Sequence, residues 1–160
     1  MATVLIKNTK QLDKIMESYI KSALKKTQDE IALAIQESIN EFYKEYSPTF
    51  YKRTYKFLNS LVKTDIRRIG NTIQCEVKID EEYLKYSYPN KGFSHNLSAT
   101  GLDVVQWANR DIHGFGNHGG SVDVGRNDGF FNAGLQDLGG NIGIVSIFKT
   151  NLQKRGLKIG

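Results

Sequence analysis

The sequence is poor in cysteine and in proline. Cys75 is the single cysteine among 160 residues, so the chain cannot form an internal disulfide and cannot build a cysteine-based zinc site. Pro48 and Pro89 are the two prolines, which excludes a proline-rich linker between domains. A chain of this length can bury a hydrophobic core, and we predict a single domain over residues 1–160.

Long apolar runs are missing as well. The run from Val4 to Ile6 is too short for a signal peptide or a membrane span, so we expect a protein that works without a membrane. The 22 basic and 17 acidic side chains give a net charge of +5. The surplus lies in the first half, with 13 basic against 8 acidic residues up to Ile69 and 9 against 9 from Gly70 onward. Such a bias suits contact with nucleic acid or an acidic protein, and it equally suits a solvated, lysine-rich helix face.

One long helix organises the first region, residues 1–47. Apolar side chains recur at steps of three and four from Leu12 to Tyr46 with no proline or glycine between them, which predicts an amphipathic helix of about 35 residues. Pro48 ends it, because proline lacks the N–H donor and disfavours helix at the preceding residue. Such a helix would be roughly 50 Å long, more than a domain of this size readily covers. It is expected to project from the body or to pack on a neighbouring subunit; the alternative is an ordinary core helix with a kink.

Residues 48–113 predict an antiparallel sheet and a short helix. Two apolar series alternate on either side of a Gly70–Asn71 turn, the pattern of a β-hairpin with one buried face. In this pattern Cys75 is a small hydrophobe of the core rather than a nucleophile. Thr100 as N-cap and Asp103 in the first turn predict the short helix. The two alternating series are Val62, Thr64, Ile66 and Ile69, then Ile73, Cys75, Val77 and Ile79.

The last part of the chain is rich in glycine. Glycine recurs ten times between Gly114 and Gly143, which predicts an extended loop over residues 114–140 that is flexible until a partner fixes it. Residues 141–160 predict a C-terminal helix and tail, stopped by Gly156. The expected fold is therefore α+β: a long N-terminal helix, an antiparallel sheet with a hairpin, a short helix, a glycine-rich loop, and a C-terminal helix packed on the sheet.

The stretch "WANRDIHGFGNHGG" places His113 and His118 five residues apart, close to several aspartates. A metal site needs three or four ligands held rigidly, whereas these histidines stand among glycines. A catalytic pair would need a nucleophile, but Cys75 is expected to be buried and no GxSxG motif is present. We therefore expect no enzyme activity, no metal or other cofactor and no small-molecule substrate. A metal-dependent hydrolase using His113 and His118 is the lesser alternative.

The order of these segments resembles that of the head–tail joining proteins of long-tailed bacteriophages, also called neck, tail-completion or minor tail proteins. In that family the long helix is typically followed by a proline and then by TG-x-L-x-x-S-[ILV]. The helix "VVQWAN" leading to "HGG" and the closing "FKTNLQKRGLKI" resemble two further places in the family. Thr54, Leu58, Ser60 and Leu61 approximate the first pattern, with Tyr55 where glycine is usual.

The resemblance implies a structural protein of the virion or of a phage-tail-like particle, assembled in the cytoplasm of the bacterial host. It implies a closed ring, six-fold by expectation, at the head-proximal end of the tail, which completes or caps the tail and joins it to the head or collar. Its partners would be further copies of itself, the tail tube or tail terminator protein, and a head connector, adaptor or collar protein, with DNA passing through the ring. The residues expected at subunit or partner contacts are Ile31, Ile35, Phe42, Trp107, His113, His118, Gly119 and Gly120.

A basic nucleic-acid-binding module is the main alternative function. It is favoured by the basic first half and by the tyrosines there, although no groove-reading helix or RNA-binding signature is present.

Overall fold

The computed structural model describes residues 8–45, 55–88, 97–109, 112–113, 122–123 and 129–157. Within these ranges the chain is an α+β protein with a long N-terminal helix, small antiparallel hairpins, short helices and a C-terminal helix, as the sequence predicts.

Helix α1 (Thr9–Glu45) is one unbroken helix of 37 residues. It begins after Asn8, whose side-chain oxygen Oδ1 accepts a hydrogen bond from the Gln11 amide at 2.9 Å and so satisfies one of the free donors of the first turn. No proline or glycine interrupts it, and at 1.5 Å per residue its length is about 55 Å. The predicted helix is confirmed, without a kink.

The predicted hairpin is confirmed, in two consecutive pieces. Strand β2 (Arg67–Ile69) pairs with β3 (Thr72–Gln74) across the Gly70–Asn71 turn, where Gly70 has φ +60°. Strand β1 (Leu61–Lys63) pairs with β4 (Val77–Ile79) further along. Between the two pieces three residues, 64–66, stand opposite two, 75–76, so the ladder is interrupted and the register slips by one.

The alternation predicted for the returning strand is also confirmed. Ile73, Cys75 and Val77 are half-buried and Ile79 is buried, while the residues between them are exposed. The outgoing strand departs from the pattern at its end, because Ile69 next to the turn is 54% exposed.

Two further antiparallel pairs lie beyond the hairpin: β5 (Tyr86–Tyr88) with β6 (Leu97–Ala99), and β7 (Ile112–His113) with β8 (Val122–Asp123). In the described part of the chain the strands form four separate two-stranded pairs rather than one continuous sheet. Helix α2 (Glu81–Leu84) packs against α3 (Gly101–Asn109). The Thr100 hydroxyl accepts from the Asp103 amide at 3.2 Å and donates to the Asp103 carboxylate at 2.7 Å, which confirms the predicted cap.

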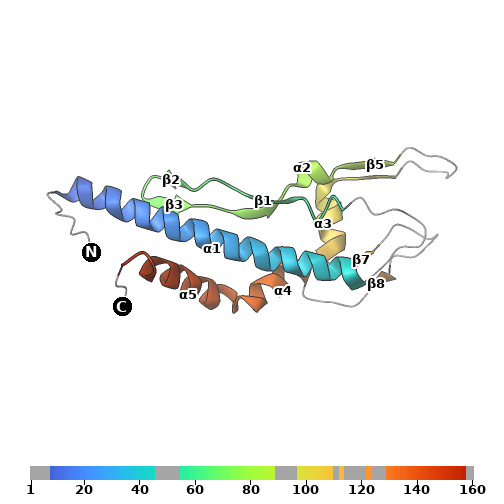
Figure 1. The fold of residues 1–160 in the computed structure, drawn as a ribbon. Coiled ribbons are helices and arrows are strands. Elements are labelled where there is room, and N and C mark those ends of the chain that lie inside the picture. Colours follow the sequence, from blue (N-terminus) through green and yellow to red (C-terminus); the bar gives the residue numbers. More distant parts are fainter. Residues whose placement is uncertain are drawn as a thin grey trace.

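Helix α1 lies between two layers (Figure 1). The β1–β4 and β2–β3 pairs run along one side of it, and α4 (Gly129–Asp137) with α5 (Gly140–Gln153) along the other. The prediction that the C-terminal helix packs on the sheet is therefore wrong. Both the half-buried strand face and α5 pack on α1, because α1 carries packing side chains on two sides rather than along one stripe.

The glycine-rich segment is not a loop throughout. Residues 129–137 form α4, so this part of the predicted loop is wrong. Gly134 lies so close to α1 that a Cβ there would come within 3.1 Å of the Ala34 carbonyl oxygen and of the Ile35 backbone. Glycine in this helix therefore permits close helix packing. Gly139 and Gly140, at φ +80° and +63°, make the break between α4 and α5.

The hydrophobic core lies where α1, the strands and α2 meet. Its buried members are Ile35, Ile39, Phe57, Ile79 and Leu84. Gly156, at φ +93°, follows the end of α5, as predicted.

Candidate functional site

The third side of α1, between the strand layer and the α4–α5 layer, faces outward. Lys26, Leu33, Glu37 and Lys44 follow one another at steps of seven, four and seven residues, which places them on one face of the helix, and all four are exposed. We call these residues the open face of α1. Leu33 is the apolar member and is 59% exposed.

The strand layer is fastened to one flank of the open face. The Gln28 side-chain amide donates at 2.9 Å to the carbonyl oxygens of both Thr64 and Glu76. These carbonyls belong to the interrupted stretch between the two hairpin pieces, where the regular ladder does not provide all the partners. Next to them Lys63 pairs with Asp29 at 2.6 Å. The interruption of the hairpin and the buried Gln28 therefore fix the strands on α1.

Helix α5 is fastened to the other flank by a buried polar contact. The Asn151 amide, which is buried, donates to the Thr27 hydroxyl at 3.3 Å and to the Glu30 carboxylate at 3.1 Å. The Thr27 hydroxyl in turn donates to the Ala23 carbonyl at 3.0 Å. These buried donors and acceptors meet only when α5 is at one position along α1, so the contacts fix the register of α5 along α1.

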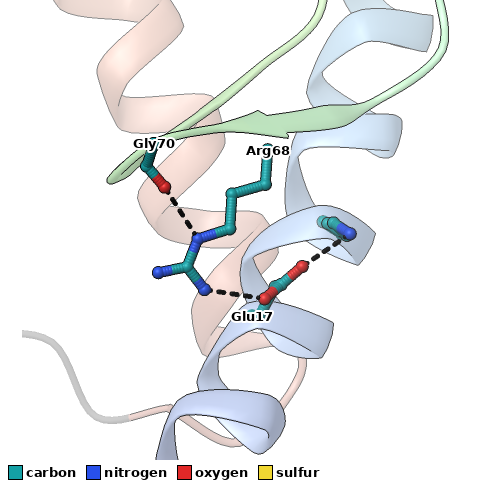
Figure 2. A network of polar contacts seen from close by, with 4 residues as sticks. Glu17, Arg68 and Gly70 are labelled. Carbon is teal, nitrogen blue, oxygen red and sulfur yellow. Dashed lines mark hydrogen bonds and ion pairs between the residues drawn. The ribbon is translucent and has the colours of Figure 1, made fainter.

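The tip of the hairpin is held to the N-terminal half of α1 (Figure 2). Arg68 donates from Nε to the Gly70 carbonyl at 3.0 Å and from Nη1 to the Glu17 carboxylate at 2.9 Å. The other oxygen of Glu17 pairs with Lys21 at 2.6 Å. Hydrogen bonds from Lys21 and then Arg68 lower the pKa of Glu17 below its usual range. Arg68 thus points toward α1.

The neighbours of Arg68 in the strand point the other way, because successive side chains of a strand alternate between its faces. Arg67 and Ile69 therefore share the outward face of β2, and both are exposed. We call Arg67 and Ile69 the outward tip. It combines one cationic side chain, which makes no ion pair within the described residues, with one apolar side chain that is more than half exposed.

Charge is unevenly distributed along α1. From Thr9 to Lys26 the helix carries five lysines and two acidic residues, and from Thr27 to Glu45 five acidic residues and one lysine. Several like charges stand four residues apart, which disfavours a helix by a few tenths of a kcal/mol per pair. Examples are Lys10 with Lys14, Lys21 with Lys25, and Glu37 with Glu41. Opposite charges at the same spacing, as in the Glu17–Lys21 pair, offset part of this cost.

The outer side of α5 is a second exposed apolar surface. Ile142 is 85% exposed, and Val145 one turn later is also exposed. Beside it, a groove of about 260 Å³ between α1 and α5 is lined by Glu30, Asn151 and Lys154, among others. Its volume is below the range of small-molecule pockets, so we assign it no ligand.

Two of the contact residues predicted on α1 are not exposed on its surface. Ile35 is 2% exposed and belongs to the core, and Ile31 is half-buried against the same cluster. The prediction that Ile35 contacts another subunit is therefore wrong, because the strand layer and α4 of its own chain cover it. Leu33 and Glu37, which are exposed on α1, are not among the contact residues predicted from the sequence. The sequence offered one indication of this exposure: Leu33 is an apolar residue that lies outside the regular series of apolar positions of the helix.

The remaining predicted contact residues lie at least partly outside the described residues. Phe42 is in α1 and Trp107 in α3, but their side chains fall outside the described part, as does that of His113 in β7. His118, Gly119 and Gly120 fall wholly outside it. Within the described ranges, no three His, Cys, Asp or Glu side chains are grouped so that they could hold a metal ion.

Cys75 lies half-buried on the α1 side of the hairpin. Burial, and then the nearby charge of Glu76, raise the pKa of its thiol. The thiolate is the reactive form of cysteine, so this environment is that of a packing residue rather than a nucleophile.

The architecture defines a class: a small α+β protein in which, among the described residues, one long helix is covered on two sides and open on the third. Within that class, the family model named YomN matches residues 8–154. The chain belongs to the YomN family, which is phage-derived. No curated protein and no solved structure matches it. No helix among the residues that the structure describes is long and apolar enough to cross a membrane.

Proposed function

We propose that this protein is a structural subunit of a phage or phage-tail-like particle, which forms a ring at the head-proximal end of the tail and joins the tail to the head or collar. The observation that carries the proposal is the open face of α1 in a chain from a phage-derived family. The open face presents the apolar side chain of Leu33 among the charged side chains of Lys26, Glu37 and Lys44.

The conformation of Tyr55 supports the resemblance on which the proposal draws. Tyr55 stands where head–tail joining proteins usually have glycine, and its φ is +54°, in the left-handed region that favours glycine. Its ring lies 5.2 Å from that of Tyr43, measured between centroids, so a packed aromatic contact offsets part of the conformational cost. Tyr55 thus has a backbone conformation that glycine adopts more readily, at the position where the resemblance leads us to expect glycine.

The partners in this proposal are further copies of the chain, a tail tube or terminator protein on one side, and a head connector, adaptor or collar protein on the other. The subunit has a structural role and no catalytic one. DNA would pass through the ring without being read.

A phage that lacks this chain provides the direct test. Electron microscopy should show filled heads and complete but separate tails, and supplying the chain from a plasmid should restore joined particles. Immunogold labelling of wild-type particles should mark the junction of head and tail. Normal joined particles without the chain would contradict the proposal.

A nucleic-acid-binding function is the second candidate, because the N-terminal half of α1 and the hairpin tip expose Lys10, Lys14, Lys25, Lys26 and Arg67. Retention on DNA that falls steeply with salt would support it. Retention equal to that of an unrelated protein of the same net charge would exclude it.

A further inference from the structure

Two exposed surfaces of this chain complement each other but cannot meet within one molecule. The outward tip carries Arg67 and Ile69, and the open face of α1 carries Glu37 and Leu33. Arg68 fastens the tip beside Glu17, and Leu33 and Glu37 are 16 and 20 residues further along the same helix. These intervals correspond to about 24 Å and about 30 Å.

The two surfaces also match in spacing. Residues two apart on a strand are separated by about 6.6 Å, and residues four apart on a helix by about 6 Å. Ile69 can therefore lie against Leu33 while Arg67 lies against Glu37. Ile69 with Arg67 and Leu33 with Glu37 thus each combine one apolar with one charged side chain, and these two charges are opposite. The two lysines of the open face, Lys26 and Lys44, lie seven residues from Leu33 and from Glu37, respectively, about 10 Å along the helix.

The order of charges on α1 extends this complementarity. The half of α1 that contains Leu33 and Glu37 is predominantly acidic, whereas the outward tip adds Arg67 to the predominantly basic half. In Figure 1 the tip lies at the end of the molecule that also holds the N-terminal end of α1. The open face extends along the helix toward the opposite end.

We propose that the outward tip of one copy docks on the open face of α1 of the next copy, with Ile69 on Leu33 and Arg67 paired with Glu37. This inference rests on the proposed function and names the partner of the open face as a second copy of the chain. Because the two surfaces differ, the contact is head-to-tail. Such contacts close into a ring when the rotation between copies closes.

A charge exchange tests the contact. The single variants Arg67→Glu and Glu37→Arg each bring like charges together, so each should weaken assembly by about tenfold or more in the association constant. Combining both changes in one chain restores opposite charges and should return assembly to within about threefold of the wild type. Analytical ultracentrifugation measures assembly, and circular dichroism and melting temperature show that each variant is folded.

Matched controls change the same charges elsewhere. Lys78→Glu on an exposed strand position and Asp137→Arg at the end of α4 should leave assembly unchanged. Equal weakening by the controls, or a double variant as weak as the singles, overturns the contact. An effect of Arg67→Glu without one of Glu37→Arg also overturns it and indicates another acidic partner, such as DNA.

A crosslink covers the case in which the isolated chain assembles only weakly. In a Cys75→Ser background, Arg67→Cys with Glu37→Cys should form a disulfide between copies in solution or in particles, and Lys78→Cys with Asp137→Cys should not. No crosslink in either setting overturns the inference. If heads and tails join normally without the chain, the proposed function is wrong. If joining needs the chain, but the Arg67 and Glu37 variants assemble and join heads to tails as the wild type does, the proposed function stands and this inference alone is wrong.

Discussion

At the residue scale, the structure depends on polar side chains that complete what the backbone leaves unpaired. Gln28 is the clearest case, because its amide reaches two carbonyls at the point where the hairpin ladder slips. Asn151 instead joins the side chains of two helices, because its amide donates to the Thr27 hydroxyl and the Glu30 carboxylate of α1. Both residues are buried, although the low hydropathy of glutamine and asparagine would predict exposed positions for them.

Replacing Gln28 by Leu keeps the size of the side chain and removes both donors. The Thr64 carbonyl then loses a partner, so we expect a loss of about 1–3 kcal/mol in the free energy of unfolding. Urea unfolding measures it. Gln136→Leu, at an exposed position of α4, is the matched control and should change stability by less than about 0.5 kcal/mol. Equal stabilities of the two variants would contradict the role of Gln28.

Glu17 predicts a pH dependence of stability. Its pKa is lowered from 4.5 by Lys21 and Arg68, so the ionised carboxylate stabilises the folded chain above the ordinary pKa, and this contribution is lost as the pH falls through the lowered value. The melting temperature of Glu17→Gln should therefore be below that of the wild type at about pH 7, and the difference should shrink toward about pH 3. A difference independent of pH would contradict the pairing.

At the element scale, α1 separates residues that look alike in the sequence. Ile35 and Leu33 are both aliphatic and two positions apart, but Ile35 is in the core and Leu33 is on the open face. The 3.6-residue period of the helix turns one side chain inward and the other outward.

Glutamate at each position makes the difference measurable. Ile35→Glu buries a charge without a partner, so the variant should fail to fold or lose several kcal/mol, more than about 3. Leu33→Glu should change the free energy of unfolding by less than about 0.5 kcal/mol, because its side chain already faces water. Thermal unfolding followed by circular dichroism compares them. A stable Ile35→Glu chain would show that the strand layer does not cover this side of α1.

Gly134 sets how closely α4 approaches α1. Leucine in its place would force the helices apart, since a Cβ alone would already be 3.1 Å from backbone atoms of Ala34 and Ile35. We expect Gly134→Leu to lower the free energy of unfolding by about 1–3 kcal/mol. Asn132→Leu, exposed on the same helix, tests the substitution without the close contact and should be nearly neutral. A neutral Gly134→Leu would argue against the packing of α4 on α1.

At the scale of the whole molecule, the part of the chain that the structure describes covers the long helix on two sides and leaves the third open. An assembly can therefore form through α1 without unfolding any part of the subunit, since the open face is separate from the core. The outer face of α5, with Ile142, is a further surface that a ring subunit could present to a different protein.

The histidines give a prediction for the whole protein, since their side chains lie outside the described residues. We expect the purified chain to contain no stoichiometric metal, because the glycines around His113 and His118 cannot hold ligands rigidly. The double variant His113→Ala with His118→Ala should keep the metal content and the melting temperature of the wild type. Elemental analysis measures the metal content, and thermal unfolding before and after chelation shows whether a metal stabilises the fold. Stoichiometric bound zinc would contradict this prediction and favour the hydrolase alternative.

The sequence by itself determined the elements that depend on local chemistry. Four features follow from neighbours within a few residues. They are the unbroken helix from Thr9 to Glu45, the Gly70–Asn71 turn, the Thr100–Asp103 cap, and the end of α5 shortly before Gly156. Period, turn and cap need no information about distant parts of the chain, because each is set by dihedral preferences and by nearby donors and acceptors.

The tertiary structure alone decided which surfaces meet. Packing on both sides of α1 depends on contacts between residues far apart in the sequence. These are Gln28 with the slipped hairpin, Asn151 with Thr27, and Gly134 with Ala34. The helix α4 within the glycine-rich segment has the same cause, since glycine disfavours a helix by itself and is favoured where two helices must lie close. These long-range contacts bury Ile35 and expose Leu33, and so place the candidate interaction surface on the side of α1 that nothing in the described chain covers.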